Sequence, residues 1–155
     1  MIREHRRVTA SAIVSLHEGD LAQLEALLAD NHLPVDDCRE QYSIFHAIYL
    51  DDELIAAGGV EPAGNFGLLR SIVVKPEHRG GGLARRLTDH LLERAQEEGR
   101  EAIYLLTESA ADYFAGLGFR PVERADVPVA ITRTRQFSSL CPDSASCLFL
   151  PLPRV

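Results

Sequence analysis

Residues 69–84, LRSIVVKPEHRGGGLA, decide the fold of this chain. The apolar run from Phe66 to Val74 predicts a strand, which Pro76 closes. A glycine run at Gly80–Gly82 then opens a long helix, because apolar residues recur at helical spacing from Leu83 onward. The first N–H groups of a helix have no intrahelical acceptor. With the positive end of the helix dipole, these donors form a site for a phosphate or pyrophosphate, although the run alone also fits a plain glycine-rich turn.

Two familiar nucleotide-binding motifs do not fit this loop. A P-loop requires Lys followed by Ser or Thr after its last glycine, whereas Leu83 and Ala84 follow Gly82. The dinucleotide fingerprint G-x-G-x-x-G requires a final glycine, and Arg85 occupies that position. The loop therefore indicates a different phosphate-containing ligand.

Further elements are predicted on both sides of the loop, and their order mixes antiparallel hairpins with one crossover. Asp20 and Gln23 together predict a capping box at the start of the first helix. The order predicts an α/β or α+β fold, with a central mixed, mostly antiparallel sheet flanked by helices, in a single domain over residues 1–155. The expected strands are Ala12–Leu16, Ser43–Leu50, Leu54–Val60, Phe66–Val74, Ala102–Leu106 and Phe119–Val122; the expected helices are Asp20–Asp30, Leu83–Gly99 and Ser109–Leu117; the expected turns are Asp51-Asp52 and Ala63–Asn65.

The composition of the 155 residues is that of a globular domain, with 46% hydrophobic and 25% charged residues. The formal net charge of −7 repels nucleic acid backbones and anionic lipid. No segment reaches the about 18 apolar residues of a membrane span, and the N-terminus lacks the apolar core of a signal peptide. We expect a cytoplasmic protein that binds neither nucleic acid nor membrane.

Two blocks resemble the N-acetyltransferases of the GNAT superfamily, from the first strand to about Val122. Residues 79–84, RGGGLA, match the acetyl-CoA signature Arg/Gln-x-x-Gly-x-Gly/Ala, and residues 110–119, AADYFAGLGF, resemble the second cofactor-side helix with its closing Gly-Phe. This resemblance implies acetyl-CoA as cosubstrate and no metal. Loop amides would hold the pyrophosphate, and the strand edge before the loop would pair with the pantetheine arm. The implied cofactor residues are Ile72, Val73, Val74, Arg79, Gly80, Gly81, Gly82, Leu83, Ala84 and Phe114.

Narrower resemblances concern the acceptor. Residues 105–122, Val127-Pro128 and the stretch 137–147 resemble the arsenic-resistance N-acetyltransferases. The central region is more distantly similar to the acetyltransferase domain of N-acetylglutamate synthases. Both resemblances imply a small-molecule amine as acceptor, such as an amino acid or an arsenic-containing analogue.

The catalytic residues are less well defined than the cofactor loop. Many GNAT enzymes have a tyrosine near the cofactor sulfur where this chain has Phe114. Tyr113 is the neighbour of Phe114 and is the candidate proton donor to the thiolate, but adjacent helical positions point about 100° apart. Two alternatives stay open: Tyr113 is a core tyrosine, or the thiolate leaves without a proton donor. The amine must also lose a proton, for which Glu61 and Glu108 at strand ends are the candidates; either also fits a solvated surface acid. His46 is a weaker candidate.

Arg70 is a candidate for substrate binding. In an alternating strand it shares a face with Leu68, Ile72 and Val74, where a charge is costly unless it is paired. Either Glu61 or Glu108 pairs with it structurally, or it binds a substrate carboxylate in a bidentate contact.

The predicted function is direct acetyl transfer from acetyl-CoA to a small amine, without an acyl-enzyme intermediate. The alternative is a non-catalytic acyl-CoA-binding sensor or an arsenical-binding module. Cys38, Cys141 and Cys147 are the candidate ligands of an arsenical-binding module, because thiolates bind soft ions such as trivalent arsenic. The favoured interpretation of these cysteines is that they are small buried thiols. The sequence leaves open whether two copies form a homodimer.

Overall fold

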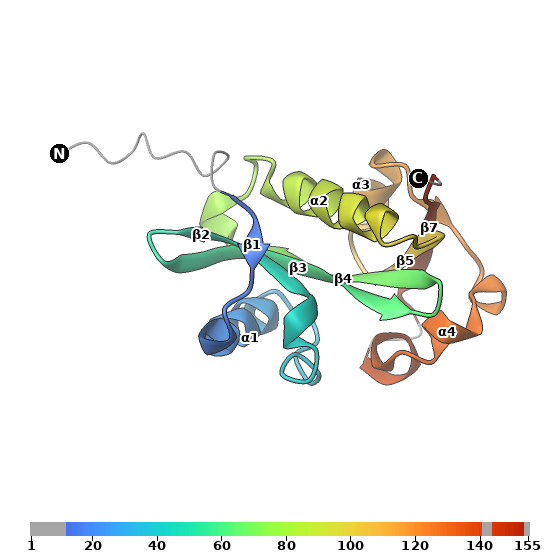
Figure 1. The fold of residues 1–155 in the computed structure, drawn as a ribbon, viewed down its shortest axis with the longest axis horizontal. Helices are drawn as coiled ribbons and strands as arrows, with labels where there is room; N and C mark the ends of the chain where they lie inside the picture. Colours follow the sequence, from blue (N-terminus) through green and yellow to red (C-terminus); the bar gives the residue numbers. More distant parts are fainter. Residues whose placement is uncertain (1–11, 141–143, 154–155) are drawn as a thin grey trace. The chain divides into compact units, whose positions relative to one another are not determined.

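The computed structural model describes residues 12–140 and 144–153. Its strands form a seven-stranded sheet in the order β1-β2-β3-β4-β5-β7-β6 (Figure 1). β4 and β5 pair in parallel, whereas β1–β2, β2–β3, β5–β7 and β6–β7 are antiparallel. The predicted mixed, mostly antiparallel sheet with flanking helices is therefore confirmed. The strands are β1 Val14–Ser15, β2 Phe45–Leu50, β3 Glu53–Ala63, β4 Phe66–Val74, β5 Ala102–Thr107, β6 Arg120–Pro121 and β7 Ser146–Pro151.

The helices are α1 Leu21–Asp30, α2 Leu83–Glu97, α3 Ala111–Gly116 and α4 Val129–Thr132. Short 3₁₀ turns occupy Glu18–Asp20, Tyr42–Ile44, Pro76–His78 and Arg124–Asp126, and a π-helical turn covers Gln136–Leu140. The positions of β4, β5 and α2 agree closely with the predictions. β1 is shorter than predicted, and β7 was not predicted, because its apolar core Leu148–Leu150 is too short to distinguish from a loop.

Close contacts divide the chain into two compact units. The first consists of the described residues up to Gly59 together with Ser71–Leu91, and the second consists of Val60–Arg70 together with the described residues from Leu92 onward. β3, β4 and α2 each have residues in both units. The expectation of one domain over residues 1–155 stays a prediction.

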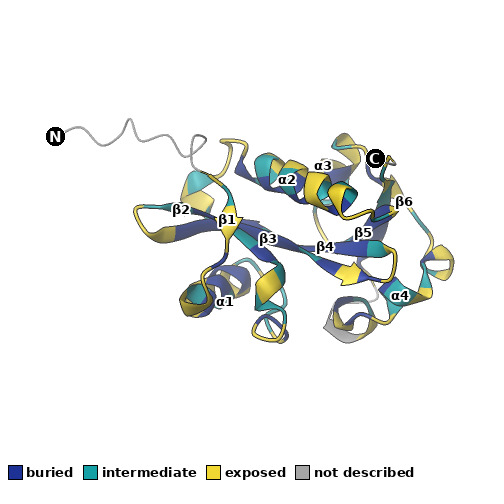
Figure 2. Cartoon of the chain, in the orientation of Figure 1, coloured by how far each residue is buried: buried dark blue, intermediate teal, exposed yellow. Residues whose placement is uncertain are grey.

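The strands of the first unit are covered on both faces. Leu24 and Leu28 of α1 pack in one buried cluster, and Leu83 and Leu87 of α2 pack in another (Figure 1). Figure 2 shows that the buried residues of each helix lie along its sheet-facing side. The spacing of these leucines is that of an amphipathic helix.

The β2–β3 hairpin closes through the predicted two-residue turn. Asp51 and Asp52 both have left-handed φ values, 52° and 66°, as a type I′ turn requires. The pairing register shifts by one residue after Ile48. As a result, Ile55 and Ala56 both pack in the cluster formed with α2, as expected at a β-bulge.

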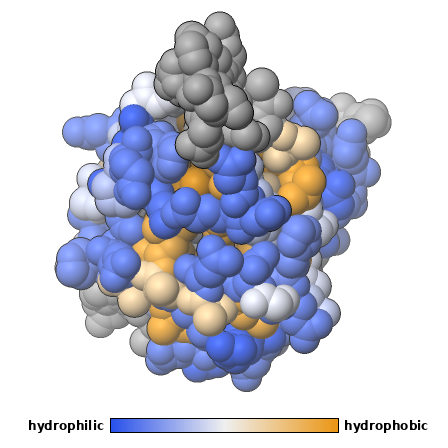
Figure 3. Space-filling model, turned by 90° about the vertical axis from the view of Figure 1, so that its left-hand side faces the viewer, coloured by the Kyte–Doolittle hydropathy of each residue, from blue (hydrophilic) through white to orange (hydrophobic). Residues whose placement is uncertain are grey.

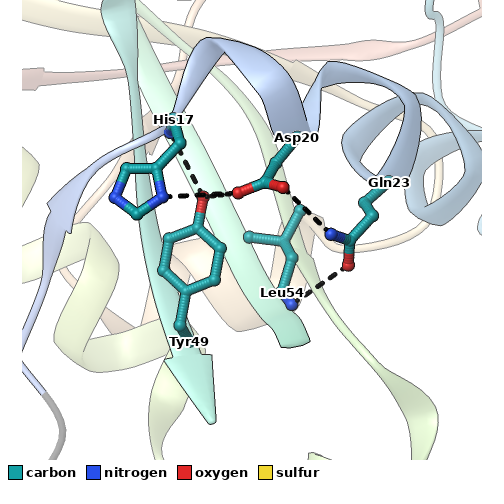
Figure 4. A network of polar contacts seen from close by, with 5 residues as sticks. All are labelled: His17, Asp20, Gln23, Tyr49 and Leu54. Atoms are coloured by element: carbon teal, nitrogen blue, oxygen red, sulfur yellow. Dashed lines mark hydrogen bonds and ion pairs between the residues drawn. The ribbon is translucent and has the colours of Figure 1, made fainter. Parts of the chain in front are cut away.

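The start of α1 differs from the predicted capping box. Asp20 caps no backbone N–H group; its carboxylate instead accepts hydrogen bonds from the Gln23 amide at 3.1 Å and the Tyr49 hydroxyl at 2.8 Å (Figure 4). The predicted cap is therefore wrong. The 3₁₀ turn Glu18–Asp20 runs directly into the helix and gives Asp20 a φ of −101° and a ψ of 12°, whereas an N-cap residue is extended.

Contacts of Asp20 and of its neighbours His17 and Gln23 join the start of α1 to the β2–β3 hairpin. Gln23 accepts a hydrogen bond from the Leu54 backbone N–H at 3.3 Å, and the His17 ring stacks on Tyr49 with centroids 4.8 Å apart (Figure 4). Burial, together with the neighbouring Asp20 carboxylate, raises the pKa of Tyr49 to about 12. The Tyr49 hydroxyl therefore remains a hydrogen-bond donor at neutral pH.

The second unit has its own core on β5 and β7. Tyr104 stacks on Phe149, with ring centroids 5.7 Å apart, and meets the edge of Phe66 at 5.9 Å. Ile131 of α4 and Cys147 of β7 are buried in the same cluster. The tail of the described chain is therefore part of a folded core.

Hydrophilic residues dominate the side of the molecule drawn in Figure 3, with hydrophobic residues in separate patches. Among residues 12–138 and 144–153, the large hydrophobic side chains that are exposed are those of Val14, Tyr113 and Val129. No helix in these ranges combines the length and hydrophobicity needed to cross a membrane.

Candidate active site

The glycine loop has the backbone conformation of an anion site. Gly80 and Gly82 have left-handed φ values of 85° and 84°, and a Cβ added at either would meet no protein atom within 4 Å. Backbone conformation is therefore the requirement for glycine there. The first backbone hydrogen bond of α2 runs from the Arg86 N–H to the Gly82 carbonyl at 3.0 Å. The preceding amides of this turn thus have no intrahelical acceptor, as phosphate binding requires.

Arg79 precedes these glycines and is tied to two elements. Its Nε donates to the Val74 carbonyl at 3.2 Å, and its Nη2 donates to the side-chain oxygen of Asn31. Asn31 was not among the predicted site residues. It follows the last turn of α1, and no local sequence pattern connects it with a loop 48 residues away.

The strand leading to the loop is irregular at one residue. Ser71 has a φ of 61°, a left-handed conformation that is uncommon for a side-chain-bearing residue in a strand. Further along β4, Val73 packs in the cluster with α1 and Val74 in the cluster with α2. A Cβ added to Gly58 would lie 2.3 Å from Cδ1 of Ile72. Gly58 therefore leaves room for the side chain that follows the irregularity.

The pairing of β4 with β5 covers two positions, Gly67 with Ile103 and Leu68 with Tyr104. The predicted pantetheine-binding residues Ile72–Val74 lie beyond these positions on the same strand. Ile72 is half-buried, and the two valines are buried.

Arg70 and Glu61 form a buried ion pair. Nη1 of Arg70 lies 3.3 Å from Oε1 of Glu61, and the two side chains are 1% and 11% exposed. The left-handed Ser71 interrupts the regular alternation predicted between Arg70 and Ile72. Of the two carboxylates proposed as partners of Arg70, the structure thus brings Glu61 to it.

The remaining catalytic candidates lie around α3. Glu108 follows β5 and is exposed. Tyr113 is 42% exposed, and its ring meets Phe114 edge-on at 5.2 Å. Phe114 is buried and packs edge-on against Phe119 at 5.8 Å. The turn after α3 closes through Gly118, whose φ is 103°, in the manner of a glycine C-cap.

Two further groups complete the inventory of polar candidates. His46 contacts His90 of α2, with Nδ1 and Nε2 3.3 Å apart, and sequence reasoning did not anticipate this pair. Cys38 and Cys147 are buried free thiols, and burial raises the pKa of Cys147 to about 11. Cys141 lies outside the described residues. Within those residues, no group of three or more His, Cys, Asp or Glu side chains is arranged to hold a metal ion.

The family follows from these features and from comparison with known proteins. The model of the acetyltransferase (GNAT) family matches residues 12–119, which is more than half of the chain. The chain belongs to this acetyltransferase family.

Curated relatives of this chain include amino-acid acetyltransferases. An amino-acid acetyltransferase of Pseudomonas aeruginosa is 31% identical over 93 residues, which cover 59% of this chain and 21% of the relative. One from Neisseria meningitidis is 24% identical over 151 residues, which cover 85% of this chain and 33% of the relative. The chain thus spans between about a fifth and a third of the length of these relatives.

Solved structures share the fold. N-acetylglutamate synthase from Neisseria gonorrhoeae, complexed with coenzyme A and N-acetyl-glutamate, superposes with a TM-score of 0.80 at 20% identity over 92% of this chain and 35% of that chain. Rv2747 from Mycobacterium tuberculosis, in complex with CoA and NLQ, has a TM-score of 0.76 at 18% identity over 92% of this chain and 99% of that chain.

Proposed function

We propose that this protein is an acetyl-CoA-dependent N-acetyltransferase that transfers the acetyl group directly to the amine of a small molecule in the cytoplasm. The observation that carries the proposal is the loop before α2, where left-handed Gly80 and Gly82 leave the first amides of the helix without intrahelical acceptors. This loop lies within the segment matched by the acetyltransferase family. The net charge of −7 disfavours nucleic acid and anionic membranes as partners.

Acetyl-CoA would be held mainly by backbone groups. Amides of Gly80–Ala84 would bind the pyrophosphate, because they point out of the helix start where its dipole is positive. The edge of Ile72–Val74 would pair with the amides of the pantetheine arm as an added strand does. Phe114 would supply an apolar contact to the same ligand.

The reaction is a direct acyl transfer, without an acyl-enzyme intermediate. The neutral amine attacks the thioester carbonyl carbon; the C–N bond forms, the C–S bond breaks, and the CoA thiolate leaves. The amine loses one proton, which Glu61 or Glu108 would accept directly or through water. Glu61 is ion-paired with Arg70 at 3.3 Å, whereas Glu108 is exposed. Tyr113 is the proposed proton donor to the thiolate.

An amino acid is the proposed acceptor, and an arsenic-containing analogue is the narrower alternative. The relatives named amino-acid acetyltransferases support the amino acid. Arg70 supplies a buried cation for its carboxylate, provided that the guanidinium serves both the substrate and Glu61.

Two measurements test the proposal. Acetyl-CoA at millimolar concentration should raise the melting temperature, whereas NAD and ATP should not. A thiol-release assay with amino acids, plain amines and an arsenic-containing amino acid then identifies the acceptor. No stabilisation by acetyl-CoA would refute the proposal, and stabilisation without turnover of any acceptor would indicate a non-catalytic acyl-CoA sensor.

A further inference from the structure

A hydrogen-bonded connection joins the end of α1 to the start of the cofactor loop. Asn31 follows α1, and its side-chain Nδ2 donates to the Leu27 carbonyl at 2.8 Å. Its side-chain oxygen accepts from Nη2 of Arg79. The two ends of an amide are chemically distinct. Because the nitrogen is held by a carbonyl of the helix, the oxygen is presented to the guanidinium.

Arg79 is held from a second direction as well. Its Nε donates to the carbonyl of Val74, the last residue of β4, at 3.2 Å. This contact closes the turn that contains Pro76–His78. The carbonyls at the end of α1 form the negative end of its dipole, which also favours the cation. The backbone just before Gly80 is therefore fixed by both β4 and α1.

The end of α1 is itself anchored in the core. The Leu33 N–H donates to the Leu28 carbonyl at 2.9 Å, and the His32 N–H donates to the Ala29 carbonyl at 3.1 Å. With His32 at a left-handed φ of 61°, these two bonds form a Schellman motif. Leu28 is buried and Leu33 packs against the same cluster, so Asn31 is presented from a rigid turn.

We propose that Asn31 is a positioning residue for the cofactor: it holds Arg79 and, through Arg79, the orientation of the Gly80–Gly82 amides toward the pyrophosphate. This inference rests on the proposed function, because it presupposes that the loop binds CoA. Asn31, which directly follows α1 and lies 48 residues before Arg79, would thus contribute part of the affinity for the cosubstrate.

Two substitutions separate the contact with Arg79 from the contact with Leu27. Asn31→Ala removes both contacts, whereas Asn31→Asp keeps an oxygen for Arg79, loses the donor to Leu27 and adds one negative charge. We would measure CoA binding by calorimetry at about 0.3 M salt, which screens the added charge. Asn31→Ala should weaken binding about 5- to 10-fold, the value of one hydrogen bond. Asn31→Asp should stay within about threefold of the wild type, because its oxygen still binds the guanidinium.

Steady-state kinetics and a double variant complete the test. In Asn31→Ala, KM for acetyl-CoA should rise while kcat and the acceptor KM stay within about twofold. In an Arg79→Ala background, Asn31→Ala should cause no further loss of CoA affinity. A merely structural Asn31 predicts equal CoA affinity for its Ala and Asp variants, and that result, or additive losses with Arg79→Ala, would overturn the proposal. Wild-type protein that does not bind CoA would instead overturn the proposed function, and this inference with it.

Discussion

At the scale of single residues, the three glycines of the loop before α2 are not equivalent. Gly80 and Gly82 have left-handed φ values, whereas Gly81 does not. The left-handed region costs a residue with a Cβ about 1–2 kcal/mol. The loop therefore needs glycine at its first and third positions for its conformation, and at its second position only for close approach of a ligand.

This difference gives a matched pair of variants. Gly82→Ala should lower the free energy of unfolding by about 1–2 kcal/mol, whereas the exposed Gly81→Ala should change it by less than about 0.5 kcal/mol. Urea denaturation of both variants measures the difference. Equal losses of unfolding free energy in the two variants would contradict the conformational explanation. They would indicate that contacts around the loop cause the loss instead.

Arg70 gives the second prediction at this scale. Arg70→Gln removes the cation paired with the buried Glu61 carboxylate, so the free energy of unfolding should fall by about 3 kcal/mol, as when one member of a buried ion pair is removed. If Arg70 also binds the acceptor, KM for amino acids should rise by a factor equivalent to about 1.5–3 kcal/mol. Affinity for acetyl-CoA should be nearly unchanged.

Urea denaturation and acceptor kinetics in the folded variant separate these roles. Lower stability with a normal acceptor KM would restrict Arg70 to the ion pair. In that case the preference for amino acids over plain amines would lose its structural support.

At the scale of elements, α1 is attached to the β2–β3 hairpin by polar contacts as well as by its leucines. The hydroxyl of Tyr49 donates to Asp20 at 2.8 Å and accepts from the His17 backbone N–H at 3.2 Å (Figure 4). Burial raises the pKa of Tyr49 to about 12 from the usual value of 10. The folded protein therefore binds the phenolic proton more tightly than the unfolded chain does.

The pH dependence of stability follows from this difference. The contribution of Tyr49 should be complete below pH 10 and be lost as the pH rises from about 10 to 12, because the unfolded chain releases the proton first. Tyr49→Phe should lower stability at pH 8 by about 1 kcal/mol, for the lost hydrogen bond. It should also remove part of the alkaline decline that urea denaturation of the wild type shows between pH 9 and about 11.5. An identical alkaline decline in both proteins would contradict the role of Tyr49.

At the scale of the whole molecule, the proposed mechanism predicts the kinetic pattern. Direct transfer requires acetyl-CoA and the acceptor to be bound together, so initial rates against both substrates should give intersecting lines in a double-reciprocal plot. The thiol of Cys147, whose pKa burial raises to about 11, is protonated at neutral pH and is not a nucleophile. Mass spectrometry of protein mixed with acetyl-CoA alone should find no acetylated residue, whereas parallel lines and a trapped acetyl-enzyme would indicate an acyl-enzyme route.

The sequence by itself determined the elements whose signals are local. The apolar run of β4, the glycine loop and the leucines of α2 follow one another in the chain, so their periodicities and turn residues specify strand, loop and helix without other parts of the molecule. The same holds for the Asp51-Asp52 hairpin and for membership of the acetyltransferase family, whose model matches the sequence over residues 12–119.

Only the tertiary structure decided the contacts between distant residues. Glu61 rather than Glu108 pairs with Arg70, Asp20 binds Tyr49 instead of capping α1, and Asn31 holds Arg79. A short side chain can satisfy its hydrogen bonds with any nearby partner, and which partner is near depends on strand register and helix docking. The left-handed Ser71 shows the same limit, because no residue pattern marks the point at which a strand departs from alternation.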